Sequence, residues 1–206
     1  MCNLYRLQKG PEAVRKAFDD LLLALRFPDG IPNFQPREIR ITDRAPIVRA
    51  VDGDPELVER RWSWPASGGK PVYNYRAEGR DLPRGRCLIL ADGFYEFTAH
   101  SDPKAKRKHK WLFTRGEDEL FAIAGLWRND ATIGEAFTML TCPPGPDVAP
   151  YHSRQIVVLP AAQWQSWLDP TVPSRDLLQP LPAGSLTVTQ VDQDESESQS
   201  ALFSIR

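Results

Sequence analysis

The residue best suited to covalent chemistry in this chain is Cys2, directly behind the initiator methionine. Methionine aminopeptidases remove the initiator when the next side chain is small, so we expect Cys2 to become the first residue. Its α-amine then titrates near about 7.7–8.0 and its thiol near about 8.5, which leaves both partly nucleophilic at neutral pH. Such a pair condenses with an aldehyde, first as an imine and then as a five-membered thiazolidine. The alternative is a chance cysteine in a frayed terminus.

Glu96 and His152 are candidates for moving protons during such a reaction. Glu96 lies in "GFYEF", where Tyr95 and Phe97 can exclude water from its carboxyl group and raise its pKa. The alternation of the same run equally allows Glu96 to lie on the solvated face of a sheet. His152, in "APYHSRQIVVLP", carries an imidazole that titrates near neutral pH. Its alternative is a hydrogen-bonded loop histidine at the start of a strand.

Several short motifs, in their order along the chain, resemble the SRAP (SOS response-associated peptidase) family. They are "MC", "N-x-R-A-E", "R-C-L-x-x-A-x-G-F-Y-E-[WF]", "AGLW" and "H-x-R", and they extend from Cys2 to about Pro160. That family binds single-stranded DNA with abasic sites and links its N-terminal cysteine to the sugar aldehyde as a thiazolidine. The resemblance implies that Asn74 bonds the sugar or orients the amine, that Glu96 is the catalytic acid, and that His152 helps to open the sugar hemiacetal.

A site for single-stranded DNA also requires cations for the phosphates and flat side chains for the bases. Arg76 matches the arginine of the "N-x-R" motif, and Arg154 would share a side with His152 in extended chain. Trp62 matches a tryptophan that the family places against the bases, although a core position is the alternative. We expect DNA contacts from Arg76, Arg154, Trp62, Arg84 and Arg86. Many members begin "MCGRF", whereas this chain continues with Asn3, Leu4 and Tyr5, and Arg6 is the candidate substitute.

Two other functional classes remain open from the sequence. The first is a cysteine peptidase with Cys2 as nucleophile and His152 as base. If it cleaves itself, the cleavage would only expose Cys2. The second is a module that binds single-stranded DNA without chemistry, whose binding would survive Cys2→Ala. A peptidase requires the thiol but no free amine, whereas a thiazolidine requires both.

The composition limits the class of protein. A net charge of −1, from 26 basic and 27 acidic residues, excludes a polycation that coats nucleic acid, so any anion site must be local. The three cysteines Cys2, Cys87 and Cys142 show no CxxC spacing, which argues against a disulfide framework or a structural zinc site. We find no secretory signal and no apolar run of the ~20 residues that span a membrane. We therefore expect a cytoplasmic monomer, nucleoid-associated when bound to DNA, without metal or cofactor.

The elements that must position these residues are mostly strands. Apolar spacing predicts a helix over residues 11–26, and a second helix over 161–169 is bounded by prolines. Runs rich in β-branched and aromatic residues predict strands at 45–51, 86–98, 110–115, 120–127, 136–142, 155–160 and 185–191. The pattern and the resemblance together indicate an α+β fold: a curved, barrel-like, mostly antiparallel sheet with a few flanking helices. We expect one SRAP-like domain over residues 1–206, with the acidic segment 192–200 loosely ordered.

Overall fold

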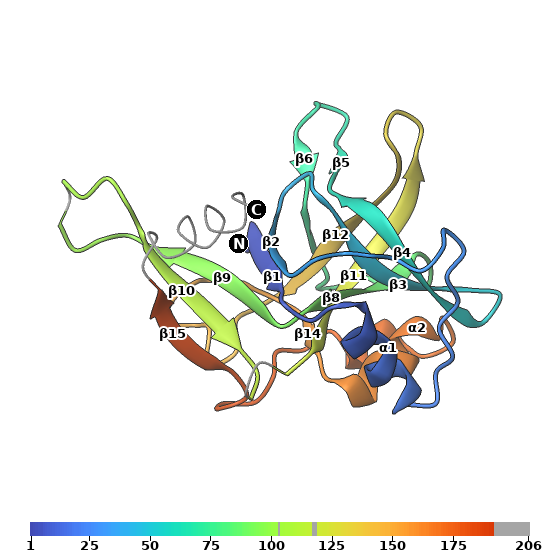
Figure 1. The fold of residues 1–206 in the computed structure, drawn as a ribbon. Coiled ribbons are helices and arrows are strands. Elements are labelled where there is room, and N and C mark those ends of the chain that lie inside the picture. The colour runs from blue at the N-terminus through green and yellow to red at the C-terminus, as the bar shows by residue number, and fades with distance from the viewer. Residues whose placement is uncertain (103, 117–118, 192–206) are drawn as a thin grey trace, which may run out of the picture.

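The computed structural model describes residues 1–102, 104–116 and 119–191. Figure 1 shows two sheets that meet near the N-terminus, with both α-helices gathered beside one of them. The strands are β1 (Leu4–Leu7), β2 (Arg37–Arg40), β3 (Arg44–Val51), β4 (Asp54–Trp62), β5 (Trp64–Pro65), β6 (Pro71–Val72), β7 (Asn74–Arg76), β8 (Arg86–Ala91), β9 (Gly93–Thr98), β10 (His109–Thr114), β11 (Phe121–Asp130), β12 (Gly134–Cys142), β13 (Gln155–Ile156), β14 (Val158–Leu159) and β15 (Thr187–Val191). The helices are α1 (Pro11–Asp19), α2 (Trp164–Leu168) and two short 3-10 helices, η1 (Ala161–Gln163) and η2 (Ser174–Asp176).

Five strands close into a barrel. Antiparallel pairs join β4 to β3, β3 to β8, β8 to β11 and β11 to β12, and a short parallel pairing of β12 with β4 completes the ring. Closure pairs both edges of each of these strands over at least part of its length. Every residue of β8 is buried, because one face points into the barrel and the other is covered by neighbouring elements such as α2. The expected α+β fold with a barrel-like, mostly antiparallel sheet is confirmed.

The second sheet has the order β15-β10-β9-β1-β2 and holds the N-terminal strand between β9 and β2. The sequence predicted one strand over residues 86–98, and this is wrong, because the run divides at Asp92. Its first half, β8, belongs to the barrel, and its second half, β9, belongs to the second sheet. The fully buried Asp92 forms an ion pair with Arg6 and accepts hydrogen bonds from the backbone N–H groups of Gln8 and Lys9. The chain therefore changes sheet at a residue that also anchors the end of β1.

The two predicted helices differ in how well they match the structure. The helix expected over 11–26 ends at Asp19, because the chain reverses at Leu22, which has a φ of 58°. The reversal lets the backbone of Arg26 pair with β4, donating to Pro55 O at 2.8 Å and accepting from Leu57 N at 2.9 Å. The helix expected over 161–169 is confirmed as η1 followed by α2. The helices lie together, with the rings of Phe18 and Trp164 4.9 Å apart.

The described ranges contain no candidate membrane span and no candidate metal site. None of the helices there is both long enough and apolar enough to cross a membrane. No group of three or more His, Cys, Asp or Glu side chains in those ranges is placed to hold a metal ion. The acidic segment 192–200 lies outside the described residues.

Candidate active site

The four residues named as catalytic lie on four different segments that meet at the start of the chain. Cys2 directly precedes β1, and Glu96 lies on β9, which pairs with β1. Asn74 begins β7, which runs parallel to β12 of the barrel, and His152 lies in the connection from β12 to β13. The site therefore forms where the N-terminal strand of the second sheet meets the barrel.

Asn74, Glu96 and His152 hold the first two residues of the chain in place. The N-terminal ammonium of Met1 donates to His152 Nε2 and lies 3.4 Å from Glu96 Oε2. Asn74 Nδ2 donates to the backbone carbonyl oxygen of Cys2 at 2.8 Å. An amine at the beginning of the chain is thus bound between an acid and an imidazole, and the adjacent backbone is fixed by an amide.

The thiol of Cys2 lies inside the protein. The residue is 1% exposed, and its Sγ donates to the carbonyl oxygen of Leu4 at 3.2 Å. Burial, and next the negative charge of Glu96, raise the pKa of the Cys2 thiol well above its usual value. The thiol is therefore protonated at neutral pH, and a nearby base must accept its proton before sulfur attacks a carbon atom.

Glu96 is buried rather than solvated, with 2% of its surface exposed. Desolvation raises the pKa of its carboxyl group to about 7, although the Met1 ammonium acts in the opposite direction. A carboxyl group with this pKa both donates and accepts protons near neutral pH. Among the described residues, neither Glu96 Oε1 nor Asn74 Oδ1 has a hydrogen-bond partner. Two buried acceptors are thus available to donors that a ligand would bring.

His152 is arranged to act as a neutral base. Partial burial, and then the positive charge of the Met1 ammonium, lower the pKa of its imidazole. Its Nδ1 lies 2.9 Å from the carbonyl oxygen of Arg154 and 3.0 Å from the backbone nitrogen of the same residue. When Nδ1 carries the proton and donates it to that carbonyl, Nε2 accepts from the terminal amine.

An ion pair that the sequence analysis did not identify fixes the segment that carries His152. Arg154 bonds both carboxylate oxygens of Glu78, at 2.5 and 2.8 Å, and also donates to the carbonyl of Thr141 at 3.0 Å. The bond from Arg154 lowers the pKa of Glu78 to about 2. Glu78 is the last residue of the "N-x-R-A-E" motif, and that position was the available signal for its role.

The chain as a whole matches a known protein family. The model of the family described as SOS response associated peptidase (SRAP) matches residues 1–197. The chain belongs to the SRAP family. Two solved structures share its fold: a protein of Bordetella bronchiseptica, with a TM-score of 0.68 at 25% identity, covering 93% of this chain and 100% of that one, and a phage-related protein of the same species, with a TM-score of 0.71 at 22% identity, covering 93% and 95%.

Curated relatives of this SRAP chain are named abasic site processing proteins. YobE of Bacillus subtilis is 32% identical over 125 residues, which are 55% of this chain and 56% of YobE. YoqW of the same species is 30% identical over 146 residues, which are 63% of this chain and 64% of YoqW. The chain therefore matches little more than half to just under two thirds of the length of these two relatives.

The expected DNA contacts of the SRAP chain fall into different places. Arg76 is exposed on β7, two residues beyond Asn74. Trp62 is completely buried, with its ring 5.3 Å from that of Tyr5, and its Nε1 donates to the carbonyl of Tyr73 at 2.9 Å. Arg76 is therefore available to a DNA strand beside the site. Trp62 is a core residue and is not exposed to stack on bases, so the expected DNA contact of Trp62 is wrong.

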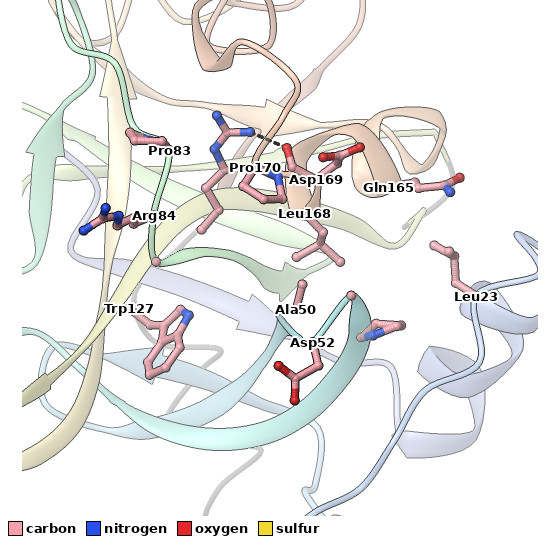
Figure 2. Close-up of a pocket in the computed structure, with 14 residues that line it drawn as sticks. Leu23, Ala50, Asp52, Pro83, Arg84, Trp127, Gln165, Leu168, Asp169 and Pro170 are labelled. Atoms are coloured by element: carbon pink, nitrogen blue, oxygen red, sulfur yellow. Dashed lines mark hydrogen bonds between the residues drawn. The ribbon is translucent and has the colours of Figure 1, made fainter.

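The two arginines that precede and begin β8 contact a different region. Arg86 is 5% exposed and donates to the carbonyl oxygens of Leu82, at 2.6 Å, and Asp169, at 2.8 Å. Arg84 is exposed, and both arginines line a cavity that the side chains of Cys2, Asn74, Glu96 and His152 do not line. Figure 2 shows Arg84 at the edge of this cavity, beside Pro83 and above Trp127.

Proposed function

We propose that this SRAP chain processes abasic sites in single-stranded DNA by forming a thiazolidine through Cys2 after removal of Met1. The observation that carries the proposal is the terminal amine bound between Glu96 and His152, next to a buried thiol. The names of the curated relatives support the choice of abasic DNA as substrate. Removal of Met1 makes the amine of Cys2 terminal and vacates the space that Met1 occupies between the acid and the imidazole.

The chemistry then follows from the residues present. The neutral amine of Cys2 attacks the aldehyde carbon, and His152 carries the amine proton to the oxygen, which gives a carbinolamine. Protonated Glu96 donates to the carbinolamine hydroxyl group, which leaves as water and yields an iminium ion. The Glu96 carboxylate accepts the thiol proton of Cys2, and sulfur attacks the iminium carbon and closes the ring. One water is lost in total, and Glu96 returns to its protonated form.

The remaining polar atoms suit a sugar and its phosphates. Glu96 Oε1 and Asn74 Oδ1, which lack partners among the described residues, would accept hydrogen bonds from sugar hydroxyl groups. Arg76, which lies on β7, would bind a phosphate, whereas the guanidinium group of Arg154 is already bonded to Glu78 and Thr141. From the same iminium ion, removal of the neighbouring sugar proton by the Glu96 carboxylate would expel the 3′ phosphate by β-elimination. Lyase activity is therefore part of this proposal.

Self-cleavage is a second candidate, because the Met1–Cys2 peptide lies within the site. The thiol of Cys2 would attack the carbonyl carbon of Met1 and displace its own amine, which gives a thioester. Water would hydrolyse this thioester, release methionine and leave Cys2 with a free amine. Chain synthesised in a system without methionine aminopeptidase should then still lose Met1, and His152→Ala should retain it. A chain that keeps Met1 under these conditions requires external processing.

Intact mass spectrometry tests the main proposal directly. The protein is measured before and after incubation with an oligonucleotide that carries one abasic site, beside the same oligonucleotide undamaged. We expect a chain that starts at Cys2 and gains the mass of the damaged DNA minus one water. Cys2→Ala should form no adduct, whereas Cys87→Ala, which removes a buried thiol on β8, should retain it. If a chain shown to start at Cys2 forms no adduct, the proposal is overturned, and unchanged DNA binding would leave a non-catalytic module.

A further inference from the structure

A cavity of about 520 Å³ lies between the β3–β4 turn, the segment before β8 and the end of α2. Its volume is in the range of small-molecule sites, which is about 300–1,000 Å³. The walls are mainly apolar, with Trp127, Leu168, Pro83 and Pro170 among them, as Figure 2 shows. The function proposed above gives this cavity no role, because its lining residues take no part in the chemistry around Cys2.

A close backbone contact joins the segment that carries Arg84 to the strand that carries Trp127 at the cavity. Gly85 has a φ of 69°, and a Cβ atom there would lie 2.5 Å from the carbonyl oxygen of Trp127. Trp127 N in turn donates to the carbonyl oxygen of Gly85 at 2.7 Å. Only glycine permits this close approach. It fixes the backbone next to Arg84 against the backbone of Trp127.

The indole itself is held from outside the cavity. The guanidinium carbon of Arg49 lies 4.3 Å from the centre of the Trp127 ring. Arg49 is only 9% exposed and forms ion pairs with Glu56 at 3.5 Å and Glu135 at 2.6 Å. A flat side chain supported in this way offers a stacking surface that requires little ordering when a ligand binds.

Two of the charged residues at the cavity, Arg84 and Asp52, are uncompensated among the described residues, in contrast to the charges around Cys2. Arg84 is exposed, and within the described residues no hydrogen bond or ion pair engages its guanidinium group. Asp52 is exposed at the tip of the β3–β4 turn, where it and Gly53 have φ values of 52° and 89°. In Figure 2 Trp127 lies between the Arg84 and Asp52 side chains. The cavity thus presents a cation, a flat ring and a carboxylate in sequence.

We propose that this cavity is a second site that binds a nucleotide, with the base on Trp127, the phosphate on Arg84 and a donor group of the base edge on Asp52. A purely apolar ligand would remove Arg84 and Asp52 from water without partners, which is unfavourable. A bare anion would leave the apolar walls unused and would face the Asp52 carboxylate. A planar base linked to a phosphate satisfies all three groups together.

The same chemistry can come from a free mononucleotide or from one nucleotide of a DNA strand, and the test separates them. Two-dimensional NMR of the full chain follows the indole N–H signal of Trp127 and the backbone amide signal of Gly85. The probes are deoxyadenosine monophosphate, inorganic phosphate, and an undamaged single-stranded oligodeoxyadenylate. Undamaged DNA carries no aldehyde, so the result is independent of whether Cys2 forms a cross-link.

We expect the mononucleotide to shift both signals and inorganic phosphate alone to bind much more weakly. Arg84→Gln should weaken mononucleotide binding about tenfold, the loss expected for one charge-assisted hydrogen bond, and Arg15→Gln on the exposed face of α1 should not. An oligonucleotide that shifts the same signals at lower concentration indicates a site for the strand; one that leaves them unchanged indicates free nucleotide. If no nucleotide probe moves these signals at millimolar concentration, or if Arg84→Gln binds as tightly as the wild type, the proposal is wrong.

Discussion

The region around Cys2 and the cavity at Trp127 treat charge in opposite ways. Around Cys2, the acid is 2% exposed and the thiol residue 1% exposed, and the nearby cation Arg154 is bonded to Glu78. At the cavity, Arg84 and Asp52 face solvent and have no partner among the described residues. Burial shifts the pKa of an acid or a thiol, and proton transfer in a reaction depends on such shifted pKa values. An exposed, unpaired charge can bind a ligand without a shifted pKa. This contrast supports our proposals of chemistry for the first region and of binding for the second.

The largest expected effect tests whether Trp62, below the Cys2 region, is a residue of the hydrophobic core. Trp62→Ala should reduce the free energy of unfolding by about 3–5 kcal/mol, because a fully buried indole and its bond to Tyr73 are lost. Urea denaturation followed by circular dichroism measures this change. Trp127→Ala, which removes a half-buried indole at the cavity, is the matched control and should cost clearly less. Equal losses would remove the contrast between the two regions.

The next effect concerns the tuned acid. Glu96→Gln should slow cross-linking about 100-fold, the lower limit for loss of a general acid or base. The wild-type rate should fall as pH rises above about 8, where the Cys2 amine is already neutral and the Glu96 carboxyl group, whose pKa is about 7, has lost the proton that it must donate. The variant should lack this decline. Single-turnover rates between pH 5 and 9 measure both, with Glu59→Gln on β4 as control. A decline that persists in Glu96→Gln would assign it to another group.

The smallest effect concerns Glu78, which we expect to act as a positioning residue through Arg154 and His152. Glu78→Gln should lower the cross-linking rate about tenfold, because it loosens the segment whose backbone holds the imidazole. Arg154 lowers the pKa of Glu78 to about 2, so the ion pair stabilises the folded state above the usual pKa near 4.5 and is lost as pH falls toward 2.

Melting temperatures separate the structural part of this effect. The difference between wild type and Glu78→Gln should be greatest at pH 6 and should shrink as pH falls from 5 toward 3. A difference that is independent of pH would mean that Glu78 does not act through its charge. An unchanged cross-linking rate with a lowered melting temperature would confine Glu78 to a structural role.

The elements that the sequence predicts best are those whose aliphatic residues are buried on both faces, such as β8 and β11. The strand β4 is absent from the prediction because its charged residues resemble a surface loop. In the structure Glu56 and Arg60 of β4 are nearly buried and pair with Arg49 and Glu135 of neighbouring strands. Local pattern also cannot show that residues 86–98 divide between two sheets, because the division depends on strand pairing distant in sequence.

The candidate site shows the same limit. The order of the motifs was sufficient to name Cys2, Asn74, Glu96 and His152, which the structure brings together. The sequence could not show that Arg154 and Arg86 are bonded within the protein. The partner of Arg154 is 76 positions away in the sequence, and that of Arg86 is 83 positions away. A cation that reads as available for phosphate can thus already be engaged within the protein.

The anchoring of β1 has a mechanical consequence. A DNA strand joined to Cys2 would be attached at the very end of the chain, so tension on the DNA would pull along β1. That strand is paired over four residues with β2, and it is paired with β9 at Tyr5 and Arg6. Force along a paired strand loads all of its hydrogen bonds in shear at the same time. Just after β1, Asp92 also accepts hydrogen bonds from the backbone N–H groups of Gln8 and Lys9. The attachment point would therefore resist force as a unit, and rupture would require the second sheet to come apart.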